Sequence, residues 1–324
     1  MRRREFIAGL GAAAAFHPLG ATAQPQRPVR VIGVLTIAEL GGRDAAFRKG
    51  LSDAGYVEGR DLAIEYRVAA GHYERLPAMA AELVASNVAL IATGGPPAAR
   101  AAKAATASIP IVFLVGSDPV KEGLVASLAR PGGNLTGVSI LARDLVSKRL
   151  ELIGELVPRV RKVGVLVNLS NPAEENLVGD LQAAAREMGL DLAIVKAGTE
   201  SEIDAAFAAL TRSQAGALVV GNDSFLTRRH EQIVALAARA GIPAIYAFRE
   251  YADAGGLISY GIDIAAAYHQ VGLYAGKILK GATPANLPVQ QPDKFELAIN
   301  LKTAKTLGLT VPPILLAQAG DVIE

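Results

Sequence analysis

Polar side chains and glycines recur where the apolar runs of this sequence end. Residues 90–93 and 109–115 are apolar runs that lead into Thr93-Gly94-Gly95 and Gly116-Ser117-Asp118. Such runs, bounded by Gly and Pro, are typical of buried parallel strands, and ligands bind beyond the carboxyl ends of these strands. The predicted binding residues, all at or near strand ends, are Thr36, Thr93, Gly94, Gly95, Ser117, Asp118, Asn168, Asn222, Asp223, Tyr246 and Tyr260.

The residue types in this set predict a site for a small carboxylate or amino acid. Hydroxyls and free N–H groups at helix N-termini, among them the amides of Gly94 and Gly95, favour an anion. Asp118 or Asp223 would receive an ammonium group, and the two tyrosines would flank an apolar or aromatic group. Each residue alone is equally well explained as a helix cap or turn residue. Their recurrence at successive strand ends favours a cleft.

Catalytic and metal-binding patterns are weak in this chain. It has no cysteine, and His72, His230 and His269 lack metal-ligand spacing. There is no Gly-x-Ser-x-Gly elbow, no Gly-x-Gly-x-x-Gly after a strand and no phosphate loop. We therefore expect a binding protein without a cofactor or metal. The pair Arg249-Glu250 is left with three interpretations: it holds a hinge, contacts the ligand or is solvated surface.

Strand and helix patterns alternate through most of the chain, which predicts an α/β protein with parallel sheets and right-handed crossovers. The expected strands are residues 29–35, 62–68, 90–93, 109–115, 135–140, 163–167, 192–196, 217–220, 244–247, 256–261 and 295–300. The expected helices include residues 44–54, 73–86, 123–129, 145–156, 174–188, 201–210, 227–240, 265–280 and 303–307. The second block repeats the first, so we predict two Rossmann-like lobes.

The last third of the chain is too short for a core of its own, so it must complete both lobes. We expect lobe 1 to comprise residues 29–143 and 256–285, and lobe 2 residues 144–250 and 290–324. The chain would then cross between the lobes three times, near residues 141–145, 248–255 and 288–292. Several crossings restrict the lobes to a hinge motion about the cleft.

The N-terminus has the three parts of a secretory signal peptide, residues 1–23. A basic start is followed by an Ala/Gly-rich apolar run at residues 7–16 and by the small-residue site Ala21-Thr22-Ala23. Arg3-Arg4 resembles the twin-arginine export signal, and the general secretory route is the alternative. No later stretch has the length of a membrane-spanning helix. We expect a soluble, exported protein.

The net charge argues against nucleic acid as a partner. The chain has 33 Lys and Arg and 31 Asp and Glu, a formal net charge of +2. The leader, with three Arg and one Glu, carries all of that charge, so the remainder is formally neutral and has no basic run. Nucleic-acid binding depends on a concentration of positive charge that this body lacks.

Several separate motifs resemble one family, the exported substrate-binding proteins of ABC transporters of the tryptophan/tyrosine type. The similar stretches are residues 47–51, 55–60, 118–120, 128–139 (LARPGGNLTGVS), 148–152, 255–261, 278–281, 287–289, 294–304 (KFELAINLKTA), 307–309 and 319–324. A departure is Gly116-Ser117-Asp118, where Gly-Gly-Asp is expected, and the loop at residues 36–43 is short.

The resemblance implies a type-I periplasmic binding protein fold. It also implies a periplasmic monomer that delivers a small solute, an amino acid or a related carboxylate, to an ABC permease in the inner membrane. A ligand sensor that signals through a membrane receptor is the alternative, and an exported enzyme of the same fold is a third possibility.

Overall fold

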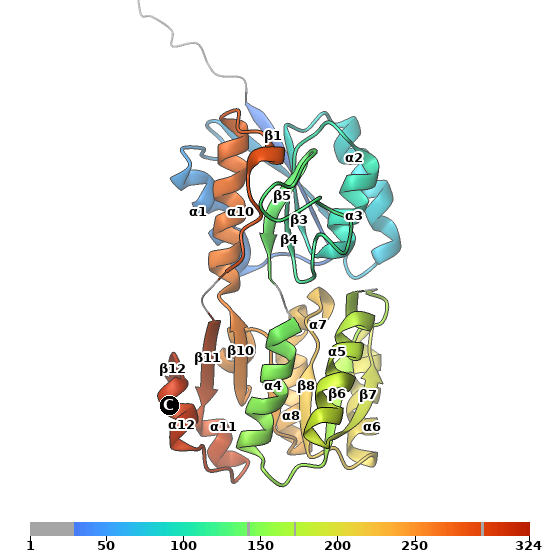
Figure 1. Cartoon of the computed structure of the whole chain (residues 1–324), viewed down its shortest axis with the longest axis vertical. Coiled ribbons are helices and arrows are strands. Elements are labelled where there is room, and N and C mark those ends of the chain that lie inside the picture. Colours follow the sequence, from blue (N-terminus) through green and yellow to red (C-terminus); the bar gives the residue numbers. More distant parts are fainter. Residues whose placement is uncertain (1–28, 141–142, 172, 293–294) are drawn as a thin grey trace, which may run out of the picture.

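The molecule consists of two α/β lobes stacked along its long axis (Figure 1). The computed structural model describes residues 29–140, 143–171, 173–292 and 295–324. The expected signal peptide, residues 1–23, lies outside them. Within the part of the chain that the structure describes, every helix is too short or too polar to cross a bilayer.

Lobe 1 is built on a five-stranded parallel sheet with the order β2-β1-β3-β4-β5. Its strands are β1 (Arg30–Thr36), β2 (Leu62–Val68), β3 (Leu90–Gly94), β4 (Ile111–Val115) and β5 (Leu135–Ser139). The central strands β3 and β4 are buried along their whole length, because helices cover both faces of the sheet. This is why their residues form continuous apolar runs.

Helices from distant parts of the chain cover the two faces of this sheet (Figure 1). One face carries α1 (Gly42–Asp53) and α10 (Ile264–Leu279), and the other carries η1 (Tyr73–Arg75), α2 (Leu76–Ala85) and α3 (Pro96–Ala105). Glycines let α1 and α10 touch through their backbones. A Cβ on Gly50 would lie 2.0 Å from the His269 carbonyl oxygen, and one on Gly272 would lie 2.2 Å from that of Phe47.

Lobe 2 contains a seven-stranded sheet with the order β12-β11-β10-β9-β8-β6-β7. Its strands are β6 (Lys162–Val167), β7 (Asp191–Lys196), β8 (Ala217–Val220), β9 (Ala244–Tyr246), β10 (Ile258–Ile262), β11 (Phe295–Asn300) and β12 (Asp321–Ile323). The helices of this lobe are α4 (Arg143–Leu156), α5 (Ala173–Met188), α6 (Glu200–Arg212), α7 (Ser224–Arg228), α8 (His230–Ala240), α9 (Arg249–Asp253), α11 (Leu301–Thr306) and α12 (Pro313–Gln318). Only the β10–β11 pair of this sheet is antiparallel in the described residues.

The strand expected at residues 256–261 belongs to lobe 2, which corrects its assignment to lobe 1. It is β10, which pairs with β9 through Ile258 and Ile245 and with β11 on its other side. The short helix α9 occupies the stretch where a crossing was expected and returns the chain directly beside β9. The crossing lies instead between β10 and α10, at Asp263. An apolar strand does not by itself specify which of two similar sheets it joins.

Two expected helices also differ in the structure. Residues 123–129 form turns and bends, in a segment that ends in Arg130-Pro131-Gly132-Gly133. The helix expected at residues 227–240 is two helices, α7 and α8, because Arg229 leaves the helical conformation with φ −102° and ψ 20°. The remaining crossings run from β5 to α4 and from η2 (Pro284–Asn286) to β11.

Candidate functional site

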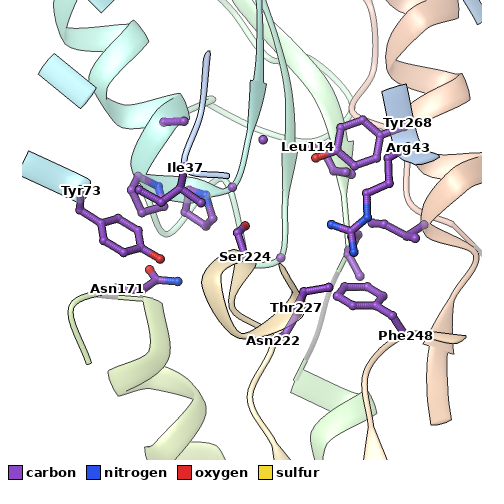
Figure 2. Close-up of a pocket in the computed structure, with 18 residues that line it drawn as sticks. Ile37, Arg43, Tyr73, Leu114, Asn171, Asn222, Ser224, Thr227, Phe248 and Tyr268 are labelled. Atoms are coloured by element: carbon purple, nitrogen blue, oxygen red, sulfur yellow. The ribbon is translucent and has the colours of Figure 1, made fainter. Parts of the chain in front are cut away.

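A pocket lies between the two lobes, at the carboxyl ends of the strands (Figure 2). It has two adjoining parts: an inner chamber of about 60 Å³ and an outer chamber of about 260 Å³. Both chambers are lined from both lobes. The residues common to the two chambers are Ile37, Arg43, Gly94, Ser224, Thr227 and Tyr268.

Arg43 places a positive charge where the chambers meet. It lies in the first turn of α1, and its Nε and Nη2 donate to Glu250 of lobe 2 at 3.0 and 2.8 Å. The guanidinium carbon lies 5.2 Å from the centre of the Phe248 ring, a cation–π arrangement. Burial lowers the pKa of Arg43, but the nearby Tyr268 and Glu250 outweigh it and leave the pKa above its ordinary value. The group is therefore a permanent cation.

Hydroxyl groups of lobe 1 also line the pocket. Tyr268, from α10, points at the end of β3, where Gly94 leaves room for its oxygen. Burial raises the pKa of Tyr268, so its hydroxyl stays protonated and can donate. Thr36, at the end of β1, is buried, lines the outer chamber, and its Oγ1 has no hydrogen-bond partner among the described residues. A buried hydroxyl of this kind is completed by a ligand or a water molecule.

The other end of the pocket is organised around Asp223, the N-cap of α7. Its carboxylate accepts from the Tyr73 hydroxyl of lobe 1, from the side-chain amides of Asn168 and Asn171 at 3.1 and 3.0 Å, and from two backbone amides of α7. These donors occupy the roughly four lone-pair positions of a carboxylate. Asp223 therefore holds lobe 2 together at this point and has no acceptor position left for an ammonium group.

Four of the predicted residues line the pocket: Thr36, Gly94, Gly95 and Asn222. The Gly95 amide donates to the Leu114 carbonyl at 2.8 Å, and prolines occupy the first two positions of α3. The anion site expected from the Gly95 amide and the start of this helix is thus largely without donors.

Other predicted residues lie behind the pocket wall. Thr93 is buried on the opposite face of the sheet from Gly94, because successive strand residues point to opposite faces. Ser117 lies outside both chambers, and its Oγ is buried without a partner among the described residues. Asn168 is buried beneath the pocket, where it holds Asp223. Tyr246 is buried in lobe 2 and stacks on Tyr251, with ring centres 4.5 Å apart.

Two predicted residues lie away from the pocket. Asp118 accepts hydrogen bonds from the amides of Val120 and Lys121 and so caps its own turn. Tyr260 lies in β10 with its ring near Phe295. The structure therefore does not bring these residues together with the pocket-lining ones.

Sequence reasoning missed the pocket residues that come from helices and loops. Among them are Arg43, Tyr73, Asn171, Thr227, Phe248 and Tyr268. No local motif marks them, apart from the position of Arg43 at the start of the helix after the first strand. The two residues of the Arg249-Glu250 pair have different partners. Glu250 binds Arg43 across the cleft, whereas Arg249 binds Asp253 and Asp321 within lobe 2.

A buried carboxyl lies beneath the lobe 2 side of the pocket. Glu174, near the start of α5, has an Oε2 atom without a partner among the described residues. Burial, and then repulsion from Asp223, raise the pKa of Glu174 well above its ordinary value. The backbone amide of Asn168 and the Arg149 cation lower this pKa, but their effect is smaller. No group of three or more side chains in the described ranges has the geometry of a metal site.

Two α/β lobes, three crossings and an interlobe pocket define a type-I periplasmic binding protein fold, and solved structures with this fold match the chain. Residues 31–323 match the family described as ABC transporter substrate binding protein, and the chain belongs to this family. It is accordingly a substrate-binding protein and not an enzyme.

Similar proteins span most of the chain. A curated relative, the tyrosine-binding protein of Clostridioides difficile (strain R20291), is 30% identical over 281 residues, 86% of this chain and 81% of the relative. A conserved domain protein from Vibrio cholerae O1 biovar El Tor has a TM-score of 0.84 at 30% identity and covers 91% of this chain and 99% of its own. An ABC domain from Streptococcus pneumoniae, solved with L-Trp, has a TM-score of 0.82 at 29% identity and covers 91% and 100%.

The whole chain is more similar to the L-Trp complex than to an open, ligand-free structure. A ligand-free, open structure of a Clostridium difficile substrate-binding protein with adhesive properties has a TM-score of only 0.64. Its identity of 27% and its coverage of 91% of this chain and 99% of its own are nearly those of the L-Trp complex. The contacts between the lobes at Arg43 and Tyr73 agree with a closed arrangement.

Proposed function

We propose that this chain is the periplasmic solute-binding component of an ABC importer and captures an amino acid or a related carboxylate between its lobes. The family supports the class of protein, and relatives named for tyrosine or solved with L-Trp support the class of ligand. The leader at residues 1–23 supports export. The partner would be the permease in the inner membrane.

The observation that carries the proposal is the position of Arg43. Its guanidinium lines both chambers, with aromatic rings on two sides. Only part of its set of five N–H donors is directed at Glu250, so the same group can hold a ligand carboxylate in fork geometry. Glu250 lines the outer chamber beside it. An amino acid would thus find a cation for its carboxylate and an anion for its ammonium, with Phe248 and Tyr268 beside its side chain.

A ligand screen with the purified protein tests this proposal. The panel contains L-tryptophan, L-tyrosine, L-phenylalanine, the other common amino acids, and aromatic acids that lack an amino group. A ligand that binds the native state at 100 times its Kd stabilises the protein by about 2.7 kcal/mol, which thermal unfolding detects readily. Calorimetry then gives the Kd of each compound that raises the Tm. If no compound raises the Tm and X-ray scattering shows no change of shape, the proposal is wrong.

Variants of α1 locate the binding site. Arg43→Met removes the cation and should abolish binding of every carboxylate in the panel. Lys49→Met is the matched control, because Lys49 lies on the exposed side of the same helix, paired with Asp53. It should leave the Kd unchanged. Equal binding by Arg43→Met and the control would place the ligand elsewhere.

Transport is tested separately in cells. Deletion of the gene should abolish uptake of the solute that the protein binds, and the wild-type gene should restore it. Unchanged uptake together with a lost behavioural response to the same solute would favour a receptor as the partner instead of a permease.

A further inference from the structure

Polar contacts join the two lobes on both flanks of the pocket. Figure 2 shows Tyr73 and Asn171 at one end and Arg43, Tyr268 and Phe248 at the other, with Ser224 between them. At the first end the Tyr73 hydroxyl of lobe 1 donates to Asp223 of lobe 2. At the second end Arg43 of lobe 1 binds Glu250 of lobe 2.

The Arg43–Glu250 pair is expected to hold the lobes together more strongly than an ordinary surface ion pair would. It is bidentate, and the side chains are only 14% and 37% exposed. A second interlobe pair, Arg228 with Glu39 at 3.3 Å, is 50% and 73% exposed, so solvent and salt screen it almost completely. Because it is bidentate and partly buried, the Arg43–Glu250 pair is the stronger of these two ion pairs between the lobes.

The Tyr73–Asp223 contact is anchored on its lobe 2 side. Asp223 is 1% exposed and is fixed by Asn168, Asn171 and the backbone of α7 before Tyr73 reaches it. Burial, and then the charge of Asp223, raise the pKa of Tyr73, so its hydroxyl is a donor at every physiological pH. A phenol that docks on a rigid, buried carboxylate makes a charge-assisted hydrogen bond only when the lobes are together.

We propose that the Tyr73–Asp223 hydrogen bond and the Arg43–Glu250 ion pair form a two-sided latch that holds the lobes closed and thereby sets the lifetime of the bound solute. The latch does not depend on which solute is bound, because both of its contacts are made between protein groups. Tyr73 and Asp223 are positioning residues in this arrangement, whereas Glu250 also lines the pocket. Because closure and solute binding are linked, weakening the latch should act mainly on the dissociation rate.

The absence of native cysteine allows a direct measurement of closure without any solute. A Cβ on Gly116 of lobe 1 would lie 3.3 Å from the Nδ2 atom of Asn222 of lobe 2. The double variant Gly116→Cys/Asn222→Cys therefore brings two thiols together only in the closed form. Under a fixed concentration of oxidant, the rate of disulfide formation reports the population of closed molecules. Each single-cysteine variant is also alkylated in the wild-type protein and in every latch variant, which measures the reactivity of each thiol separately.

Tyr73→Phe in this background tests the hydrogen-bonded side of the latch. We expect disulfide formation to slow by about tenfold, which corresponds to about 1.4 kcal/mol of closure free energy. Tyr66→Phe is the matched control, because the Tyr66 hydroxyl bonds Asp44 within lobe 1. The control should cross-link at the wild-type rate. Equal rates for Tyr73→Phe and Tyr66→Phe would overturn this side of the latch.

Glu250→Gln tests the ionic side, and its position near the surface makes misfolding a minor concern. We expect a roughly threefold slower cross-link in low salt and a smaller difference in 1 M NaCl, where the screening length is about 3 Å. Glu151→Gln, whose partner Lys148 lies on the same helix of lobe 2, is the control. A rate unaffected by Glu250→Gln at low salt overturns the ionic side. Failure of the solute screen with a positive cross-linking result would count against the proposed function alone.

Discussion

The hydroxyl oxygen of Tyr268 lies 2.8 Å from the position that a Cβ atom on Gly94 would take. Gly94 ends β3 in the middle of the lobe 1 sheet, and Tyr268 comes from α10, more than half the chain away. The glycine is therefore required because a helix from the C-terminal third supplies the wall of the pocket. Gly94 thus has a steric role in the pocket wall, and the anion contact predicted for its amide stays a prediction.

Gly94→Ala should displace Tyr268 from the pocket wall. Because the Tyr268 ring is buried, the extra methyl group forces this ring to move. The movement should lower the free energy of unfolding by about 1–3 kcal/mol and weaken solute binding. Denaturant unfolding and calorimetry measure the two effects. Gly179→Ala is the control: nothing lies within 4 Å of its Cβ position inside α5, and it should stabilise the protein by roughly 0.5–1 kcal/mol. An unchanged Kd in Gly94→Ala would separate Tyr268 from binding.

Two hydroxyl oxygens that are buried without a hydrogen-bond partner among the described residues should respond differently to removal. Thr36 lines the outer chamber, so Thr36→Val should raise the Kd of the solute by about 3- to 10-fold, the value of one hydrogen bond. Ser117 lies outside both chambers, so Ser117→Ala should leave the Kd unchanged and the unfolding free energy equal or slightly higher. Calorimetry and denaturant unfolding check both variants. A loss of affinity in Ser117→Ala would show that the pocket extends beyond the two chambers.

Gly116 and Asn222 should form the steric limit of closure. A Val side chain at position 116 would extend into the space of the Asn222 amide, so Gly116→Val should hold the lobes apart and raise the Kd at least tenfold. X-ray scattering of the solute-saturated protein should show a larger radius of gyration. Adding Asn222→Ala should restore part of the closure, since it vacates the contested space. If the double variant is as open as Gly116→Val alone, the clash lies elsewhere.

Glu174 should make stability fall as pH rises. Its pKa in the folded protein is raised well above its ordinary value, first by burial and then by Asp223. The folded state therefore favours the protonated form, and stability is lost as pH rises from the unfolded pKa, about 4.3, through the folded one. Glu174→Gln removes this loss, which is about 1.4 kcal/mol for each unit of pKa difference.

The measurement is the Tm of wild type and variant from pH 4 to pH 8. The advantage of Glu174→Gln should grow with pH across this window. Glu175→Gln, at the exposed neighbouring position, should track the wild type. An advantage that is constant with pH would mean that the pKa of Glu174 is the same in the folded and the unfolded protein.

Most of the strands and helices, and their order, follow from the amino-acid sequence by itself. Residues 217–220 and 295–300 are β8 and β11 with the expected bounds, and α3 begins at Pro96, the first of two adjacent prolines. These features are local: an apolar run needs burial on both faces, and proline is preorganised for the first turn of a helix. The repetition of the pattern in two blocks likewise predicted the two-lobed α/β architecture.

Only the tertiary structure decided which sheet β10 joins and which side chains meet in the pocket. The short helix α9 connects β9 to β10, and the two strands pair directly in the lobe 2 sheet. Arg43, Tyr73 and Tyr268 come from helices and a 3-10 turn that are far apart in the chain; the fold of lobe 1 brings them to one pocket, and residues of lobe 2 such as Asn171 and Phe248 complete it. Strand-end residues such as Asp118 and Tyr246 have the right chemistry but point into a turn and a core. Spacing along a sequence carries no information about contacts that two separately folded lobes make when they close.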